Sequence, residues 1–538
     1  MNRKLLKIWL LFYTTVCVIS NIRAQNDSGF HQGLGENQIR VLLDRGYVEY
    51  SDFGAVGDGL NDDTAAIAKT HQFANHFDLE VKAQDEATYY IGGTDSFATI
   101  QTNTTFGSAT FIIDDRSVVN RKAPIFKIKS RLQSFGIAYK TSLKKNQEKL
   151  NVSLPTNCLI TVSNNQQKVF KRKGLNQNDG HTQTDLFIVD QDGNINPETP
   201  IIWNFDQVTQ MTAIPIDSST LTIRGGRFVT IANHSDSEYN YFKRNISINR
   251  SNVMIDGLMH RISGEGSKGA PYLGFISIAE SYNVLVKNTI LTGHKEYTTL
   301  GFQGKPVSMG SYDISVNSSI DVSFVNCSQT NDINDSTYWG IMASNFCKNL
   351  IYDNCKLSRF DAHMGVYNAT ICNSTLGHMG INAIGSGTLT IKNSTVRAKY
   401  FINLRKDYGS TWQGKFMIYN CTFQPTEGNG KDVILINGSN SGQHDFGYVC
   451  YMPESILIEN LLIDEINLDG NDYQPVVFAD FNSKMASNAY TEHFPYIKTK
   501  YLILKNLKYN SNKPVKISDN AFMFKNIEIK GNTQYELF

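Results

Sequence analysis

The chain has 538 residues, of which 51 are basic and 50 acidic, so its formal net charge at pH 7 is only +1. This near-balance argues against nucleic acid as a partner, because proteins that bind the phosphate backbone carry a clear excess of Lys and Arg. Any anionic ligand must therefore be held by a local cluster of cations.

Residues 1–24 predict a secretory signal peptide. A basic start precedes an apolar run from Ile8 to Ser20, and Ala24 offers a small residue before a cut at Gln25. The run is too short for a permanent anchor, and no later stretch is apolar enough to cross a bilayer. Thr15-Val16 before Cys17 is a poor match to a lipoprotein signal. We therefore expect an exported protein, in the periplasm or on the surface of a Gram-negative bacterium, or secreted.

Removal of that segment takes away four basic residues and no acidic one, which leaves 47 basic against 50 acidic residues. Seven of the eight cysteines remain, with no CxxC spacing. Cys327, Cys355 and Cys421 each follow the asparagine of a repeated segment described below, so they occupy equivalent positions. Small buried thiols stacked in a core explain this placement better than metal ligation or disulfides.

Residues 48–80 predict a strand, a glycine-rich turn and an amphipathic helix. Tyr50 to Gly59 is typical of a strand that breaks into a turn, and Asn61 to Thr64 supplies helix-capping side chains. The helix then presents one apolar face that includes Ile67 and Phe73. In a solenoid, whose repeats pack only on their neighbours, such a helix would cover the exposed end of the core.

The run DFGAVGDGLNDDTAAI, residues 52–67, resembles the N-terminal signature of the pectin-lyase-like superfamily. The resemblance implies an all-β, single-stranded, right-handed parallel β-helix with an N-terminal capping helix. That superfamily includes pectate lyases, polygalacturonases and other carbohydrate enzymes, so the motif indicates the fold and says little about the reaction. The run lacks GxxxxGK and GxGxxG, which argues against a phosphate-binding loop.

Residues 80–220 show a weaker pattern. Ala87 to Gly93, Thr110 to Asp114 and Leu159 to Val162 are typical of strands, and long polar loops separate them. Basic residues gather in 140–149 and 168–173. Solvated loops explain these clusters better than an anion-binding rim.

From Leu221 onward one short pattern repeats at spacings of 19 to 46 residues, which fits fixed strands joined by loops of variable length. Alternating apolar residues point inward, and an asparagine or glycine stands where the chain must turn. Stacked asparagine amides can hydrogen-bond along the axis, so we expect them to be structural. The segments are 221–225, 253–257, 284–288, 322–326, 349–354, 368–373, 388–393, 416–420, 456–460 and 502–506.

A second strand family precedes these segments in each turn, for example at Phe275 to Ile278 and Phe401 to Leu404. Two or more parallel sheets per turn is what a β-helix requires. A solenoid also escapes the size limit of a single globular core. We therefore predict one domain over residues 25–538, with an N-terminal cap at about 48–80 and closing coils at about 470–538.

Aligning the second family puts four chemically active side chains in one column: Tyr338, His363, His378 and Lys399. Equivalent side chains on successive turns lie about 4.8 Å apart. Further polar residues fall on nearby turns or in the loop of another repeat: Arg359, Asp361, Asn382, Asn403, Arg405, His294 and Lys295. The resulting patch is rich in cations, imidazoles and phenols, and poor in paired acids.

This composition fits β-elimination on a uronic-acid polymer, which needs a neutraliser for the carboxylate, a base for the C5 proton and an acid for the leaving oxygen. Either His363 or His378 would be the base. Tyr338 or the other histidine would be the acid. Arg405, Lys399 and Asn403 would neutralise the carboxylate, since Arg binds it by a bidentate fork.

Structural interpretations compete with each assignment. A single histidine on a turn is more often a surface hydrogen-bonder, and Arg359 and Arg405 could simply pair with Asp361 and Asp407. Trp339, beside Tyr338, could be a sugar-stacking platform or a packing residue.

The rival reaction is hydrolysis. Gly377 to Gly380 and Leu404 to Lys406 loosely resemble the Gly-His-Gly and Arg-Ile-Lys elements of polygalacturonase-type hydrolases acting on pectin. The carboxylate pairs of that family have no full match in this chain, which puts an inverting hydrolase in doubt. Asp313, Asp332 and Asp361 are the remaining candidates for such a mechanism.

Residues 48–115 also resemble polysaccharide lyase family 29, glycosaminoglycan lyases of gut Bacteroides, through the runs HQFANHFDLEVKAQDEATYYIGG and IQTNTTFGSATFIIDD. This likeness implies chondroitin or dermatan sulfate or hyaluronan as substrate, and it transfers no catalytic motif. A non-catalytic glycan-binding β-helix is the third alternative. We expect a monomer that requires no cofactor. Calcium would be compatible with the fold, but no Asp-rich cluster in the repeats demands it.

Overall fold

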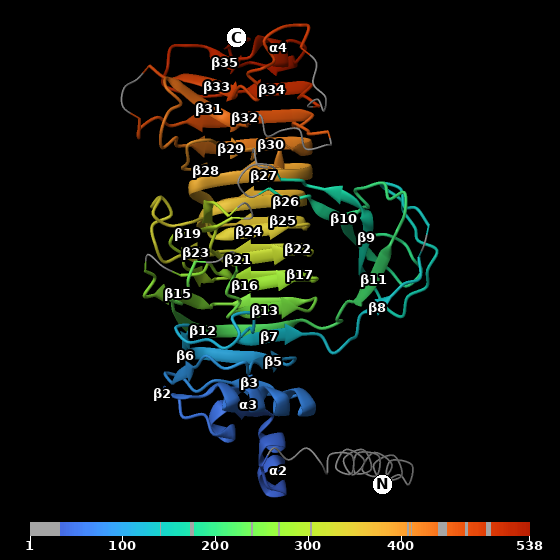
Figure 1. Ribbon diagram of the computed structural model, residues 1–538, viewed down its shortest axis with the longest axis vertical. Coiled ribbons are helices and arrows are strands. Elements are labelled where there is room, and N and C mark those ends of the chain that lie inside the picture. The colour runs from blue at the N-terminus through green and yellow to red at the C-terminus, as the bar shows by residue number, and fades with distance from the viewer. Residues whose placement is uncertain are drawn as a thin grey trace, which may run out of the picture.

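The computed structural model describes residues 33–139, 141–172, 177–237, 240–266, 269–301, 304–405, 408–409, 411–438, 449–468, 472–490 and 497–538. The predicted signal peptide lies outside these ranges. In the described chain, 31 strands form one large sheet that winds along the long axis of the molecule (Figure 1). Successive turns pair in parallel. The predicted all-β parallel β-helix is confirmed.

Two helices stand at the N-terminal end, α2 (Glu36–Arg45) and α3 (Thr64–Phe77). Helix α3 forms where the sequence predicts it, and its buried residues Ile67 and Phe73 join the core of the coil. The glycine-rich turn before it is held by Asp63, whose carboxylate accepts hydrogen bonds from the amides of Val56 (2.7 Å) and Gly57 (3.1 Å). This acceptor explains why the motif combines glycines with an aspartate.

The first coils are built from short strands around this cap. They are β1 (Tyr47–Glu49), β2 (Asp58–Asp62), β3 (Glu80–Lys82), β4 (Thr88–Ile91), β5 (Ala98–Ile100), β6 (Thr104–Asp114) and β7 (Phe126–Lys129).

Each later coil passes through three faces of this wound sheet, which we call the first, second and third sheets. The chain visits them in that order. The first sheet contains β14 (Val253–Asp256), β17 (Tyr282–Lys287), β22 (Ile320–Val325), β25 (Lys348–Asp353), β32 (Ser455–Ile463), β34 (Tyr501–Lys505) and β36 (Glu528–Gly531). The second contains β15 (Met259–Ser263), β18 (Ile290–Leu291), β23 (Ser328–Gln329) and β28 (Thr395–Val396). The third contains β13 (Ile246–Asn249), β16 (Leu273–Ala279), β21 (Tyr312–Asn317), β24 (Met342–Asn345), β29 (Ile402–Asn403), β31 (Asp432–Asn437), β33 (Gln474–Phe478) and β35 (Val515–Ser518).

Four strands continue through the corners and join these sheets: β12 (Leu221–Ile231), β26 (Lys356–Cys372), β27 (Thr375–Lys392) and β30 (Trp412–Phe423). Beside the coil, β19 (Tyr297–Leu300) and β20 (Pro306–Met309) form a small antiparallel pair. The C-terminal end carries α4 (Ala521–Phe524) and β37 (Tyr535–Glu536).

The corner between the first and second sheets is built on the predicted asparagines. These residues adopt the left-handed conformation, with φ of 51° at Asn420 and 57° at Asn460. Left-handed backbone is costly for most L-residues but tolerated by asparagine. Their amides also link successive turns, with Asn460 Nδ2 donating to Asn420 Oδ1 at 2.8 Å and Asn506 Nδ2 to Asn460 Oδ1 at 3.0 Å. The structural role predicted for the asparagines is confirmed.

The seven cysteines after the predicted signal are all buried thiols. Cys327 and Cys355 each donate a hydrogen bond to carbonyls of the first sheet, at Val286 and Phe324. The prediction of small buried thiols at equivalent positions is confirmed.

Between β7 and β12 the chain leaves the coil and forms an antiparallel module in the order β10-β9-β11-β8. Its strands are β8 (Phe135–Gly136), β9 (Cys158–Val169), β10 (His181–Val189) and β11 (Gln210–Pro215). The module lies against one side of the coil (Figure 1) and has a hydrophobic core of its own that includes Phe187 and Phe205. A buried ion pair of 2.8 Å between Asp185 and Lys348 fastens it to β25. The sequence predicted only one strand here, between long polar loops.

Candidate functional site

His363 and His378 do not share one column, which corrects the alignment predicted from the sequence. Asp361 pairs with Asn382, so His363 falls opposite Ile384, whereas His378 falls opposite the segment between Leu357 and Arg359. The reason is the number of residues in one turn of the coil. Paired residues in β26 and β27 are 19 to 21 positions apart, but the two histidines are only 15 apart. The similar His-Met-Gly triplets therefore occupy different places on their turns.

Five predicted residues do come together on the outer face of the third sheet. We call this set the polar strip: Asp361, His363, Asn382, Asn403 and Arg405. Asp361 pairs with Asn382 and Asn382 with Asn403 on successive turns. His363 stands two residues beyond Asp361 on β26, and Arg405 lies just after β29, with its Nη1 atom 3.8 Å from Asp361 Oδ1. The strip thus carries an imidazole, a guanidinium, a carboxylate and two amides.

The amides of the strip form a ladder. Asn403 Nδ2 donates to Asn382 Oδ1 at 2.9 Å, and Asn437 Nδ2 donates to Asn403 Oδ1 at 2.9 Å. Asn382 Nδ2 in turn donates to the carbonyl of Met379 at 3.0 Å. These bonds fix the amide orientations along the strip, in which His363, Asn403 and Arg405 are partly exposed while Asp361 and Asn382 are buried.

His363 is half-buried and held from two sides. Its Nδ1 atom lies 2.8 Å from Asn345 Oδ1, and its ring meets Tyr408 edge-on with centroids 5.4 Å apart. Asn345 donates its own amide to Asn317 Oδ1 at 2.8 Å, which places its oxygen toward the imidazole. Because an amide oxygen can only accept, Nδ1 carries the proton, and Nε2 holds the lone pair of the neutral ring.

Asp361 lies inside a pair of arginines. Its carboxylate is fully buried, 2.9 Å from the Nη2 atom of Arg359 and 3.8 Å from the Nη1 atom of Arg405. The Arg359 guanidinium also stands over the ring of Trp339 at 6.0 Å. Within the described chain, Arg359 Nε, Arg359 Nη1 and the Trp339 indole N–H are buried without a hydrogen-bond acceptor. These donors favour an anionic or carbonyl-bearing neighbour.

The other predicted residues lie at the corner between the second and third sheets, where the loop 330–341 crosses. Tyr338 forms an antiparallel bridge with Lys295, and the Trp339 amide donates to the carbonyl of His294 at 2.7 Å. His378 is half-buried, with Nδ1 3.1 Å from the carbonyl oxygen of Ile333. The Nζ atom of Lys295 donates to the Glu265 carbonyl at 2.9 Å.

Lys399 lies on the loop between β28 and β29, at the same corner and one turn beyond His378, so these two of the four aligned residues do lie on adjacent turns. Its Nζ atom is 3.2 Å from Glu427 Oε1, and both side chains are substantially exposed. This ion pair supports the structural interpretation of Lys399 more than a role as neutraliser.

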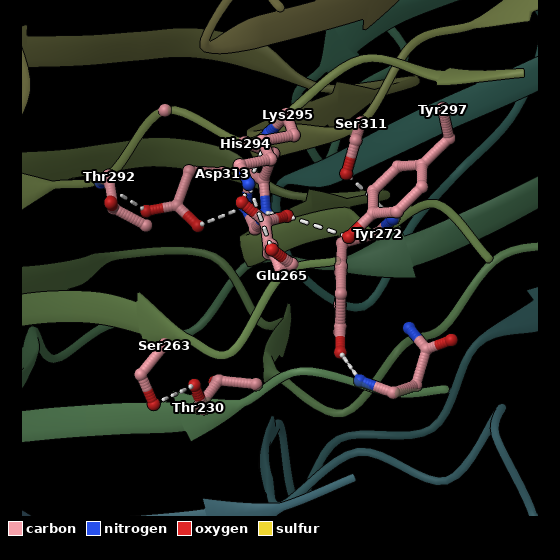
Figure 2. A network of polar contacts seen from close by, with 12 residues as sticks. Thr230, Ser263, Glu265, Tyr272, Thr292, His294, Lys295, Tyr297, Ser311 and Asp313 are labelled. Atoms are coloured by element: carbon pink, nitrogen blue, oxygen red, sulfur yellow. Dashed lines mark hydrogen bonds and ion pairs between the residues drawn. The ribbon is translucent and has the colours of Figure 1, made fainter. Parts of the chain in front are cut away.

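Beneath the Lys295 loop lies a buried network of two histidines and two acids, of which Figure 2 shows His294, Asp313 and Glu265. His294 stands between Asp313 Oδ1, 3.1 Å from its Nε2, and Glu265 Oε1, 3.2 Å from its Nδ1. The same Asp313 carboxylate lies 2.8 Å from Nδ1 of His260, whose Nε2 is 2.9 Å from the Thr230 hydroxyl. The network ties β15, the loop after β18 and β21 together.

The histidines and acids of this network shift each other's pKa values. Burial by itself would lower the pKa of His294, but hydrogen bonds to Asp313 and Glu265 outweigh it and raise that pKa to about 9. Burial would raise the pKa of Asp313, yet the adjacent His260 and His294 hold it well below its usual range. His294 is therefore an imidazolium at neutral pH, fully buried and held by acids. This favours a structural cation over a substrate-binding residue.

The carboxylates proposed for a hydrolase are not arranged as an exposed pair. Asp313 and Asp361 are each 0% exposed and paired with cations. Asp332 is exposed and accepts the amide of Asn334 at 3.0 Å. Among the described residues, no group of three or more His, Cys, Asp or Glu side chains is arranged to hold a metal ion.

Several residues of the site were missed by the sequence analysis. Asn345 and Tyr408 hold His363, and the Arg172 guanidinium of the module stands over the Tyr408 ring at 5.4 Å. Glu265 and His260 complete the buried network. Asn345 precedes a turn as the repeat asparagines do, but the others carry no periodic signal.

The described helices include none that is long and apolar enough to cross a bilayer. Neither a protein-family model nor a curated protein sequence matches the chain. Solved structures do match. Tailspike gp61 of Pseudomonas phage phi297 is 12% identical, with a TM-score of 0.50, over 90% of this chain and 84% of that one.

Two further structures match at lower scores. Tailspike gp54 of Acinetobacter baumannii bacteriophage AP22, solved with a capsular saccharide of A. baumannii, is 10% identical with a TM-score of 0.43, over 90% of this chain and 80% of that one. The A-module of the Azotobacter vinelandii mannuronan C-5 epimerase AlgE6 is 10% identical with a TM-score of 0.33, over 91% and 96%. At these identities the likeness concerns the fold alone, and the resemblance to polysaccharide lyase family 29 stays a prediction.

Proposed function

We propose that the protein is a polysaccharide lyase that cleaves a uronic-acid polymer by β-elimination, with chondroitin sulfate, dermatan sulfate and hyaluronan as the expected substrates. The observation that carries the proposal is the polar strip. It holds an imidazole, His363 on β26, whose Nδ1 atom faces Asn345 Oδ1, and a guanidinium, Arg405 just after β29, whose Nη1 atom lies 3.8 Å from Asp361 on β26.

In this proposal Arg405 and the amide of Asn403 bind the uronate carboxylate and make the C5 proton more acidic. The lone pair of His363 Nε2 takes that proton. The C4–O bond then breaks, a C4=C5 double bond forms, and an acid returns a proton to the departing glycosidic oxygen. Tyr338, on the loop at the neighbouring corner, is the proposed acid. The guanidinium supplies the positive charge, so no step needs calcium.

The strip favours elimination over hydrolysis. An inverting hydrolase needs two carboxyl groups on opposite sides of the bond, separated by roughly 6.5–9.5 Å. The one carboxylate of the strip, Asp361, is buried between two arginines, which suits it to positioning Arg405 better than to activating water. We also propose that the enzyme acts as an exported monomer.

The test is incubation of the purified chain with chondroitin sulfate, dermatan sulfate, hyaluronan and polygalacturonate, with and without EDTA. Both the absorbance of the unsaturated uronate and the number of reducing ends are followed. A lyase raises both. Reducing ends without the absorbance would show a hydrolase, and saturable binding without either product would show a glycan-binding protein. Either result would overturn the proposal.

A further inference from the structure

A cavity of about 260 Å³ lies where the antiparallel module meets the coil. The coil contributes residues of β26, β27 and β30, and the module contributes the end of β9, part of β10 and the loop at Trp203. In Figure 1 these strands lie where the module touches the middle of the coil. The coil forms one wall of the cavity and the module forms the other, so the cavity exists only because the module packs against the coil.

The wall on the coil side is formed mainly by glycine backbone and polar residues. Gly385 pairs with Trp412 and Ser386 with Gln413 on successive turns, while the Trp412 amide donates to the carbonyl of Tyr451 at 2.9 Å on the next. A side chain at Gly385 would meet the carbonyl oxygen of Val366 at 2.0 Å, so this position stays bare backbone. Gln413 is exposed and lines the cavity.

The wall on the module side is mixed. Trp203 and Phe170 meet edge to face with centroids 6.2 Å apart and supply an apolar surface. Gln183 is 7% exposed, and its Nε2 donates to the carbonyl of Asn204 at 3.2 Å. Lys168 is the one charged side chain among the described lining residues. A single cation does not suit a ligand with several negative charges.

One polar group in the cavity lining lacks a partner. Thr411 is 7% exposed, and its hydroxyl forms no hydrogen bond within the described chain. Buried hydroxyls are nearly always hydrogen-bonded, so the polar surroundings of Thr411 are incompletely paired within the described chain. An entirely apolar ligand is disfavoured because Gln413, Gln183 and Lys168 also line the cavity.

We propose that this cavity binds one N-acetylhexosamine unit of a glycan. An acetamido group offers a methyl for the apolar wall of Trp203 and Phe170, and an N–H and a carbonyl for neighbouring polar groups. The ring hydroxyls match the side-chain amides of Gln413 and Gln183. The volume is below the roughly 300–1,000 Å³ of typical small-molecule pockets, which suits one sugar ring better than a long segment of polymer.

The subsite stands on the cavity alone and does not require catalysis. If the proposed function also holds, this subsite would bind the hexosamine that alternates with uronate in glycosaminoglycans. The sugar bound there would then not be the one that reacts.

The experiment is a titration of the full chain with N-acetylgalactosamine and N-acetylglucosamine, followed by saturation-transfer NMR and tryptophan fluorescence. Galactose and glucose, which lack the acetamido group, are the matched ligands. We expect saturable binding of at least one N-acetyl sugar and at least fivefold weaker binding of its parent hexose. These monosaccharides contain no glycosidic bond, so the result is independent of lyase activity.

Gln413→Ala should weaken binding severalfold without affecting folding, because Gln413 is exposed on its strand. Trp203→Ala should abolish it, and circular dichroism would show whether that variant folds. Gln133→Ala, at an exposed glutamine that does not line the cavity, should bind as the parent does. Absence of saturable binding, equal binding of the parent hexose, or binding unchanged by Gln413→Ala would each overturn the proposal.

Discussion

The Nδ1 atom of His363 is held 2.8 Å from Oδ1 of Asn345, and that amide is itself oriented by its bond to Asn317. This arrangement sets the tautomer of the imidazole before any ligand arrives. A base whose lone pair is already on Nε2 needs no proton rearrangement to act.

We predict that His363→Gln lowers kcat on the cleaved polymer by about 10²- to 10⁴-fold, which is the usual contribution of a general base. The free energy of unfolding should change little, because the side chain is half-buried and glutamine is also polar. Steady-state rates from the unsaturated-uronate absorbance measure the effect. His378→Gln is the matched variant, and we expect a much smaller loss, since His378 lies on the neighbouring corner against Ile333. The opposite ranking would move the base to His378.

Asn345→Leu tests the positioning of the imidazole. Loss of the oxygen acceptor frees the tautomer, so kcat should fall about tenfold or more while KM changes little. The acidic limb of the pH–rate profile should shift as well, because the amide no longer contacts the ring. If the variant yielded less folded protein but the folded fraction kept the parental pH–rate profile, Asn345 would have a structural role only.

Arg405→Ala should lower kcat/KM by roughly 10²- to 10³-fold, as expected for removal of a charged group that stabilises the developing enolate. Arg405→Lys keeps the charge but loses the bidentate fork, so its kcat/KM should lie between those of the parent and Arg405→Ala. Lys431→Ala, which removes an exposed cation paired with Asp472, is the control and should retain full activity. An Arg405→Ala enzyme with parental kcat/KM would remove the guanidinium from the mechanism.

The coil was predictable from sequence because its signal is local. Each repeat asparagine sits beside its own strand, and the left-handed turn it makes depends on that residue alone. The register of the site was not predictable in the same way. His363 and His378 lie in similar triplets, but only the pairing of β26 with β27 reveals that 15 residues is shorter than a turn.

The remaining features depend on contacts between distant residues. The buried network joins Asp313 to His260 and His294, which lie 53 and 19 positions away, and no periodicity connects those distances. The module pairs Thr161 with Leu186 across an antiparallel hairpin whose polar loops mask the strand pattern. The cavity exists only where this module and the coil meet.

Asp313→Asn should destabilise the protein by about 3–5 kcal/mol, because it leaves the buried imidazolium of His294 without one of its two counter-charges. Urea denaturation at pH 7, with the midpoint and slope both fitted, measures the loss. Asp332→Asn changes an exposed aspartate in the same way and should cost less than about 1 kcal/mol. Equal stability of both variants would mean that the network contributes little.

His294 also predicts a pH dependence of stability. Its pKa in the folded protein is about 9, above the ordinary value of about 6.5 for an unfolded chain. A raised pKa means that the folded state binds the proton more tightly, so this contribution is complete below about pH 6.5 and disappears as pH rises through about 9. The loss should be on the order of 3 kcal/mol between these limits, since one pKa unit corresponds to about 1.4 kcal/mol. Urea denaturation at pH 6, 7.5 and 9 measures it.

The variant His294→Gln removes the titrating group, so it should be less stable at pH 6 and show a flatter dependence on pH. His234→Gln, at an exposed histidine, should keep the slope of the parent. If His294→Gln kept the parental slope between pH 6.5 and 9, another group would be responsible for it. Because Asp313 and Glu265 hold the imidazolium from both ring nitrogens, we expect the slope to follow His294.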